Sequence, residues 1–219
     1  MSNLIHNLNQ IKNSIPTQVT LIVVSKTRPV SEILELYNSG QKDFGENRVQ
    51  ELIQKHESLP KEIHWHLIGH LQTNKVKLIA SFVHLIHSVD SFKLLVEIDK
   101  EAKKHNRTID CLLQMHIAQE ETKFGMNFEE VCNLLENDSF IKLDNIRIVG
   151  LMGMASNVID QEQIRTEFQS LYNYFQVIKS KYFTFNPDFE HLSMGMSSDY
   201  KIAIEFESTM IRVGSIIFN

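Results

Sequence analysis

A lysine follows directly on one of the most apolar runs of the chain. Residues 19–24 read VTLIVV, the composition of a strand buried on both faces, and VVSKTRP at 23–29 ends that strand with Ser25 and Lys26. A charged side chain at a strand end is ordinarily a solvated surface group. In a cleft, however, an amine can form a Schiff base with an aldehyde, and partial burial favours this by freeing the lone pair. Lys26 is therefore the first candidate for chemistry, if a nearby group holds an aldehyde that carries an anion.

Two late segments have the residue types that hold an anion. They are HLSMGMSSDY at 191–200 and MIRVGS at 210–215. Phosphate is often bound by backbone N–H groups at helix starts, next to a glycine that lets the backbone approach. The residues that fit this role are Gly195, Ser197, Gly214 and Ser215. The alternative is ordinary loop and helix-cap chemistry.

Two further polar residues stand close to predicted strands. Arg212 lies within the last predicted strand, where a buried arginine needs a partner, and a cofactor ring nitrogen is one such partner. Asn47, in FGENRVQE at 44–51, comes just after a short strand. Asn47 can contact a ligand there, or it can cap the helix that follows.

The histidines suggest a different class of site. His64 and His66 lie on one face of a predicted strand, His70 follows, and His84 and His87 are expected at the end of the next strand. Barrel metallohydrolases use a His-x-His pair with further ligands. The spacing does not assure a third ligand here, since Trp65 and Leu67 lie on the other face of the strand and His64 is expected lower in the barrel. A metal site is therefore the weaker alternative.

These residues need elements to position them, and short apolar runs alternate with amphipathic stretches along the chain. After a first helix carrying Leu4, Leu8 and Ile11, the pattern predicts strands at 19–25, 42–46, 64–68, 82–89, 109–117, 146–152, 189–193 and 210–213. Helices are predicted at 30–38, 47–57, 72–80, from a Ser91 cap to about 104, from a capping box at Asn127, and at 164–182.

Strands that alternate with helices indicate parallel βαβ units. About eight such strands in 219 residues predict an α/β fold: a single compact (β/α)8 TIM barrel over residues 1–219, with an extra N-terminal helix. A doubly wound open sheet is the alternative. In a barrel the carboxyl ends of all strands meet at one face, which is where Lys26 is expected.

Composition narrows the class of protein. The hydrophobic fraction of 42% and charged fraction of 22% are ordinary for a soluble globular chain, and the net charge of −5 argues against binding to nucleic acid or anionic membrane. No run reaches the ~20 apolar residues that span a bilayer, and the N-terminus has no signal-peptide pattern. Cys111 and Cys132 are expected to be free, buried thiols. We therefore expect a cytoplasmic protein.

The segments together resemble a known family over nearly the full length of the chain. In family order they are VVSKTRP, FGENRVQE, WHLIGHLQTNK, HSVD, the ETKFGM region, GLMGM, LSMGMSSD and STMIRVGSIIF. This set resembles the YggS/PROSC family of pyridoxal 5′-phosphate (PLP) homeostasis proteins. The resemblance implies a barrel of the alanine racemase N-terminal domain type, with PLP as the cofactor.

The resemblance also implies roles for individual residues. Lys26, the lysine of the SK motif, should hold PLP as a Schiff base, and Arg212 should face the pyridine nitrogen or neighbouring phosphate oxygens. Ser197, Gly214 and Ser215 should hold the phosphate, and Asn47 should lie beside the ring.

We expect this chain to hold PLP with little or no catalysis. Racemisation needs a proton-transfer group on each face of the cofactor. The sequence ends just after the eighth strand, so we expect no C-terminal β-domain of the kind that supplies the second group in alanine racemase. An arginine at the ring nitrogen also weakens the electron sink. The predicted role is PLP (vitamin B6) and amino-acid homeostasis, as a monomer, with PLP-dependent apo-enzymes as recipients. A PLP-dependent amino-acid racemase or lyase is the alternative.

Overall fold

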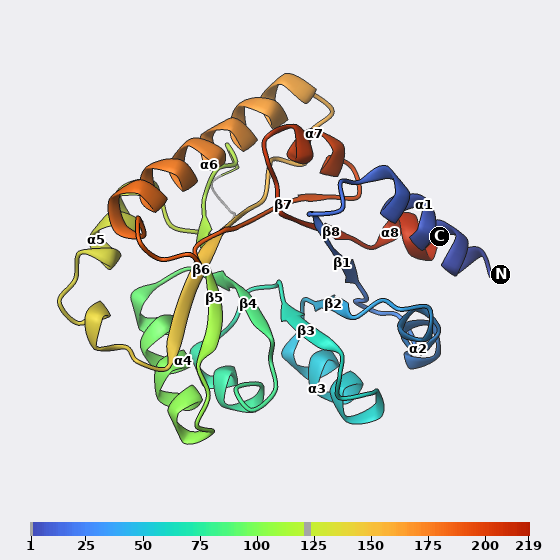
Figure 1. Cartoon of the computed structure of the whole chain (residues 1–219), viewed down its shortest axis with the longest axis horizontal. Coiled ribbons are helices and arrows are strands. Elements are labelled where there is room, and N and C mark those ends of the chain that lie inside the picture. The colour runs from blue at the N-terminus through green and yellow to red at the C-terminus, as the bar shows by residue number, and fades with distance from the viewer. Residues whose placement is uncertain (1, 121–123) are drawn as a thin grey trace.

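Eight parallel strands close into one barrel in chain order (Figure 1). In a computed structural model, which describes residues 2–120 and 124–219, each strand pairs with the next, and β8 pairs with β1. The strands are β1 Thr20–Val24, β2 Asp43–Glu46, β3 His64–Leu67, β4 Leu85–Val89, β5 Ile109–Met115, β6 Ile146–Gly153, β7 His191–Met196 and β8 Met210–Val213. The β1–β8 pairing confirms the predicted barrel and excludes the open sheet. Residues 121–123 of the ETKFGM region lie outside the described residues.

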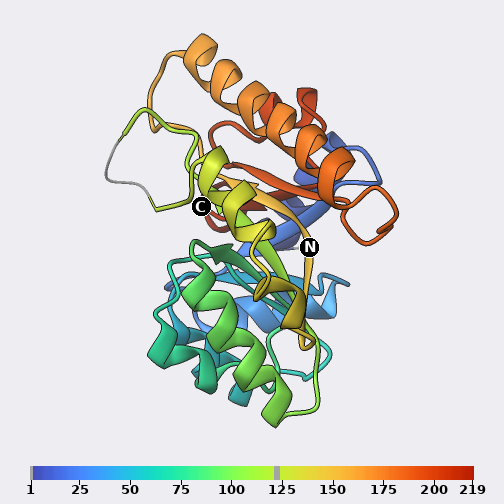
Figure 2. The same cartoon turned by 90° about the vertical axis from the view of Figure 1, so that its left-hand side faces the viewer.

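Helices surround the strands on the outside of the barrel. They are α1 Asn3–Ser14, α2 Val30–Asn38, α3 Val49–Ser58, α4 Phe92–Lys104, α5 Phe128–Leu135, α6 Gln161–Tyr182, α7 Tyr200–Glu205 and α8 Ser215–Phe218, with 3₁₀ turns η1 Thr73–Leu78 and η2 Phe140–Lys142. Figure 2 shows the long α6 (orange) and α4 (green) on opposite sides of the strands between them. Within residues 2–120 and 124–219, no helix is both long and apolar enough to cross a membrane.

The strands are buried on both faces because the barrel has apolar contacts inside and outside. On β1, Leu21 and Val23 belong to the large cluster between strands and helices, whereas Ile22 points into the barrel. The small interior cluster contains Ile22, Leu85, Leu112, Val149, Met152 and Met210. The continuous apolar run before Lys26 follows from this two-sided burial.

The extra helix α1 packs against α2 and α8. Ser2 caps it by accepting the Ile5 N–H at 3.3 Å, and Leu8 and Ile11 are buried. α1 lies against α8 at the other end of the chain (Figure 1), where the Asn7 side chain donates to the Ile217 carbonyl at 3.2 Å. The predicted N-terminal helix is therefore confirmed.

Two helices differ from their predictions. The helix expected at 72–80 is the 3₁₀ turn η1. Val76 in η1 and its C-cap residue Ile79 are three residues apart and both buried, and side chains at that spacing eclipse in a 3₁₀ helix. The helix expected at 47–57 begins at Val49, because Arg48 is the N-cap residue. The Ser91 cap and the Asn127–Glu130 capping box are both confirmed.

Two strands also begin two or more residues later than predicted. β4 begins at Leu85 and β7 at His191, where pairing with their neighbours starts. His84 therefore precedes β4 and His87 lies in its middle, so the prediction that both end this strand was wrong. Both cysteines are free, with Cys111 buried and Cys132 only half-buried.

Candidate functional site

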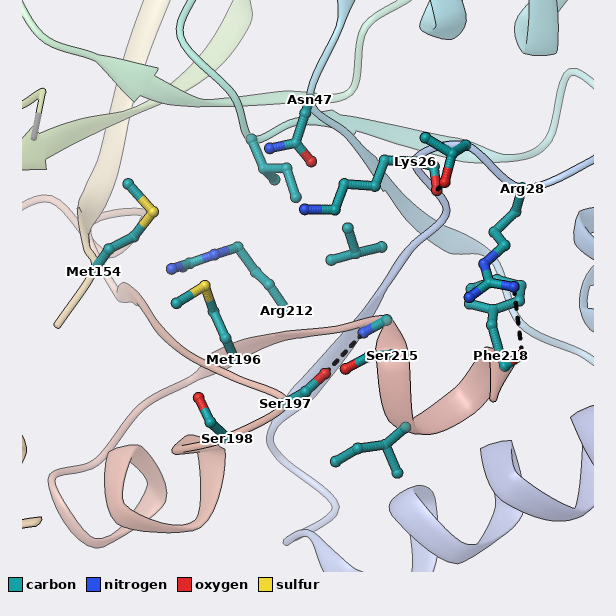
Figure 3. Close-up of a pocket in the computed structure, with 15 residues that line it drawn as sticks. Lys26, Arg28, Asn47, Met154, Met196, Ser197, Ser198, Arg212, Ser215 and Phe218 are labelled. Carbon is teal, nitrogen blue, oxygen red and sulfur yellow. Dashed lines mark hydrogen bonds between the residues drawn. The ribbon is translucent and has the colours of Figure 1, made fainter. Parts of the chain in front are cut away.

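A cavity of about 550 Å³ opens at the carboxyl ends of the strands (Figure 3). Six of the seven residues predicted to hold an aldehyde-bearing anion or its ring line it: Lys26, Asn47, Ser197, Arg212, Gly214 and Ser215. They come from the ends of β1 and β2, from the loop after β7, and from β8 and the turn that follows it. Residues from opposite ends of the sequence thus meet because the barrel closes between β8 and β1.

Lys26 extends its ammonium into this cavity from the turn after β1 (Figure 3). The side chain is exposed, whereas the sequence interpretation invoked partial burial of the amine. Within the described part of the chain, the Lys26 ammonium makes no hydrogen bond or ion pair. The amine is therefore available to a ligand.

Charged side chains from α3 hold the backbone on either side of Lys26. The Lys55 ammonium donates to the Ser25 carbonyl at 2.7 Å, and the Thr27 N–H donates to Glu51 Oε2 at 2.8 Å. Thr27 itself has a φ of 62°, a left-handed conformation that is unusual for a β-branched residue. These contacts fix the turn that directs Lys26 into the cavity.

Lys55 and Glu46 form a buried ion pair behind that turn. Lys55 Nζ lies 2.6 Å from Glu46 Oε1, which also accepts the Ser25 hydroxyl at 2.7 Å. Burial raises the pKa of Glu46, and the hydrogen bonds from Lys55 and Ser25 offset this only in part. Two lysines therefore lie at the end of β1, one with its ammonium fully engaged and one facing the cavity.

Arg212 crosses from β8 into the cavity and is almost fully buried. Its guanidinium donates to Ser193 Oγ at 2.5 Å and to the Gly153 carbonyl at 3.0 Å. Burial lowers the pKa of Arg212 to about 10, with the nearby Asp199 acting in the opposite direction. The guanidinium thus remains charged at neutral pH and is held in one orientation.

The loops after β7 and β8 meet on the side of the cavity opposite Lys26 (Figure 3). The Gly214 N–H donates to Ser197 Oγ at 3.3 Å, which leaves the Ser197 hydroxyl hydrogen for another acceptor. A Cβ on Gly214 would come within 2.7 Å of the Val24 carbonyl oxygen, so only glycine fits this close approach of β8 to β1. Ser215 is exposed beside them.

The prediction that Gly195 contributes to this cradle was wrong. Gly195 is buried and does not line the cavity. Its φ is 95°, and a Cβ there would approach the Cβ of Ala203 to 2.7 Å. The glycine instead lets β7 turn close against α7.

Asn47 does not cap α3, since Arg48 is the N-cap residue and α3 has no side-chain cap. Its Oδ1 atom is buried and has no hydrogen-bond partner among the described residues. A buried acceptor without a partner is costly. Because Asn47 lines the cavity, a donor on a bound ligand would satisfy this atom.

His66 and His87 are buried inside the barrel, whereas His84 is exposed and His64 only partly buried. His66 Nδ1 lies 3.0 Å from His87 Nε2, and the His84 ring stacks on His64 at 4.5 Å between centroids. Across residues 2–120 and 124–219, no group of three or more His, Cys, Asp or Glu side chains could hold a metal ion. The metallohydrolase alternative therefore gains no support from the geometry.

Several residues that line the cavity were missed by the sequence interpretation. Arg28 lies at the rim, with its guanidinium 4.9 Å from the ring centroid of Phe218. Met154 and Met196 form an apolar side next to Arg212 (Figure 3). Met154 and Met196 follow the sixth and seventh predicted strands, and their positions could have identified them, because the carboxyl ends of all strands meet at this face of the barrel.

Comparison with known proteins agrees with this geometry. The family profile described as "Alanine racemase, N-terminal domain" matches residues 1–219. The pyridoxal phosphate homeostasis protein of Aquifex aeolicus is 41% identical over 199 residues, covering 90% of this chain and 85% of that protein. That of Vibrio alginolyticus is 36% identical, covering 100% and 97%.

Solved structures also include similar proteins. PipY of Synechococcus elongatus, with PLP bound, has a TM-score of 0.88 and 32% identity, covering 99% of this chain and 100% of PipY. Without PLP its TM-score is 0.91, covering 98% and 99%. Alanine racemase of Clostridium difficile, with a TM-score of 0.79 and 15% identity over 99% of this chain and 59% of the racemase, shares the fold alone. By full-length similarity and by fold, the chain belongs to the family of pyridoxal phosphate homeostasis proteins, built on a barrel of the alanine racemase N-terminal domain type.

Proposed function

We propose that this chain binds PLP as a Schiff base on Lys26 and serves intracellular PLP and amino-acid homeostasis with little or no catalysis. The observation that carries the proposal is that the Lys26 ammonium, which has no partner among the described residues, lies in the same cavity as the charged, buried Arg212 and the loops of Ser197 and Ser215. PipY, which has been solved with PLP bound, is similar over the full chain.

The residues present fit the parts of PLP. Lys26 supplies the amine for the aldehyde carbon. Ser197, Gly214 and Ser215 supply hydroxyl and backbone donors for the phosphate, at the position where barrels of this kind bind phosphate. Asn47 offers its buried Oδ1 to a donor on the ring or its substituents.

Arg212 supports the non-catalytic part of the proposal. PLP, when bound, acts as an electron sink, and this sink is stronger when the pyridine nitrogen is protonated. A charged guanidinium can only donate to that nitrogen, so it keeps the nitrogen unprotonated. The fixed orientation of Arg212, through Ser193 and Gly153, suits such a contact. We therefore expect slow turnover at most.

The attachment point can be tested by borohydride reduction of PLP-loaded protein followed by peptide mass mapping. We expect a pyridoxyl adduct on Lys26, and complete loss of this adduct in Lys26→Ala. Lys42→Ala is the matched control, because Lys42 is an exposed lysine directly before β2 and does not line this cavity. An unmodified Lys26 in PLP-saturated protein would refute the proposal.

The racemase or lyase alternative has its own test. Alanine incubated in deuterated water with PLP-loaded protein should exchange its Cα hydrogen no faster than with Lys26→Ala plus free PLP. Exchange or racemisation at an enzymatic rate would replace the homeostasis proposal with the catalytic one.

The same proposal includes PLP-dependent apo-enzymes as recipients and a monomeric chain, both still predictions. Lys26 and Ser215 are exposed at the open barrel mouth, which gives a recipient access to the cofactor. Transfer from loaded protein to an apo-aminotransferase, and sedimentation at micromolar concentration, test the two predictions separately.

A further inference from the structure

A continuous chain of polar side chains crosses the interior of the barrel from Arg212. Arg212 Nη1 donates to Ser193 Oγ, which lies 2.9 Å from His87 Nδ1. His87 Nε2 lies 3.0 Å from His66 Nδ1, and His66 Nε2 lies 3.2 Å from Asp43 Oδ1. We call these five residues the interior hydrogen-bond chain.

The interior hydrogen-bond chain connects the two open ends of the barrel. Arg212 lines the large cavity at the carboxyl ends of the strands. Asp43 is the first residue of β2 and lines a second cavity of about 430 Å³, together with His64. Asp43 Oδ1 also accepts His64 Nδ1 at 3.0 Å. Four different strands supply the links between Arg212 and the opposite mouth.

The two ends fix the direction of every hydrogen bond between them. A guanidinium only donates and a carboxylate only accepts. Asp43 therefore requires a hydrogen on His66 Nε2, which leaves His66 Nδ1 as the acceptor for His87. In turn His87 carries its hydrogen on Nε2, and its Nδ1 accepts from the Ser193 hydroxyl. Ser193 Oγ then has its lone pairs free to accept from Arg212.

The charge states of His66, His87 and Asp43 agree with these hydrogen-bond directions. Burial lowers the pKa of His66 and places the pKa of His87 well below its ordinary value, so both rings are neutral. Burial acts to raise the pKa of Asp43, but the hydrogen bonds from His66 and His64 outweigh it and keep the carboxyl ionised. The opposite order would place a lone pair of His66 against the Asp43 carboxylate, which is repulsive.

We propose that Asp43, His66, His87 and Ser193 are positioning residues that orient the Arg212 guanidinium through one directed hydrogen-bond chain. Hydrogen bonds aligned in this way polarise one another, so the acceptor strength of Asp43 reaches Ser193. Arg212 is thereby held as a charged donor in the cavity. The functional consequence rests on the proposed function, because Arg212 is there assigned to the PLP ring.

Nitrogen-15 NMR of protein labelled at histidine tests the chain without any cofactor. We expect His66 and His87 each to carry a single hydrogen, on Nε2. Asp43→Ala should change the Nδ1 and Nε2 resonances of both rings, including His87, which does not contact Asp43. His105→Gln is the control, because His105 is an exposed residue at the end of α4 and should leave both rings unchanged.

A hydrogen on His87 Nδ1 in the wild type would overturn the proposal, as would an Asp43→Ala variant in which His87 is unchanged. Retention of PLP gives a second readout, at the Arg212 end of the interior hydrogen-bond chain. Ser193→Ala should lose PLP on dialysis several-fold faster than wild type and shift the absorption of the bound cofactor, whereas Ser193→Thr, which keeps the hydroxyl, should restore both. Equal behaviour of Ser193→Ala and wild type would contradict the positioning role.

The two proposals fail separately. Absence of an adduct on Lys26 with the expected histidine tautomers would refute only the proposed function. An adduct on Lys26 with the wrong tautomers would refute only the interior hydrogen-bond chain.

Discussion

Lys26 and Lys55 lie on the two sides of the same turn and have opposite environments. Lys55 is buried, and its ammonium contacts the Ser25 carbonyl, Glu46 and Glu51. Lys26 is exposed in the cavity, and its ammonium forms no hydrogen bond or ion pair with the described residues. The same side chain is thus a structural cation in one place and a candidate nucleophile in the other, and the difference lies in the acceptors around it.

The comparison also shows how the two lysines depend on each other. Lys55 and Glu51 hold the backbone directly before and after Lys26, so the buried charges fix the turn from which the free amine extends. A nucleophile is more effective when the elements beneath it are rigid. Variants that change one lysine environment and spare the other test this dependence.

The largest expected effect comes from Lys55→Met. This change leaves the Glu46 carboxylate buried without its cation, and breaking a buried pair in this way costs about 3–5 kcal/mol. Lys26→Met should change the free energy of unfolding by less than about 0.5 kcal/mol, as for other exposed side chains. Urea unfolding followed by circular dichroism measures both.

The double variant Lys55→Met/Glu46→Gln is the control for that prediction. It removes the uncompensated charge, so it should recover a substantial part of the lost stability. A double variant as unstable as Lys55→Met would mean that the Lys55–Ser25 hydrogen bond, and not the ion pair, is the main contribution.

The cost of Lys55→Met should also depend on pH. Burial already raises the pKa of Glu46, and loss of Lys55 raises it further. Between the unfolded pKa of ~4.3 and this raised folded pKa, the folded state binds the proton more tightly, so stability falls as pH rises. Each unit of additional shift corresponds to about 1.4 kcal/mol. Unfolding at pH 5 and pH 8 should therefore give a smaller penalty at pH 5; a penalty independent of pH would contradict the assignment to Glu46.

A smaller effect is expected from Glu51→Gln. Glu51 accepts the Thr27 N–H, and this bond is the largest single cause of the lowered pKa of Glu51. The amide keeps an acceptor but loses the charge, so we expect a loss of about 1 kcal/mol. PLP loading should fall in step, measured by absorbance after dialysis. Unchanged loading in a destabilised Glu51→Gln variant would separate the turn geometry from the reactivity of Lys26.

The barrel and the cavity were predictable because both follow from local patterns. The apolar run before Lys26 and the MIRV segment identified two strands, and a parallel barrel collects the carboxyl ends of all strands at one face. The cluster around Lys55 was not predictable. Lys55 lies in an amphipathic stretch whose polar residues normally face solvent, and its burial depends on how α3 lies against the turn after β1.

The interior hydrogen-bond chain shows the same limit. The sequence placed His64 and His66 on one strand face, but the contact of His87 with His66 depends on the register between β3 and β4. The contact of His87 with Ser193 joins residues 106 positions apart, on two strands that do not pair, and it forms only because the barrel closes. Strand periodicity predicts which face a side chain occupies, and it does not predict which partner lies across the barrel.

The smallest effect is expected at Thr27, between the two lysine environments. Its φ of 62° costs a β-branched residue about 1–2 kcal/mol, and glycine would relieve this cost. Glycine also increases the entropy of the unfolded chain, which lowers the free energy of unfolding by about 0.4–1 kcal/mol. It also removes the Thr27 hydroxyl, which donates to the Lys26 carbonyl at 2.6 Å. These terms nearly cancel, so Thr27→Gly should change stability by less than about 1 kcal/mol while PLP dissociates faster from a more mobile Lys26. Thr27→Asn, which tolerates the same conformation, should retain PLP better than Thr27→Gly. Equal retention by both variants would show that the α3 contacts alone fix the turn.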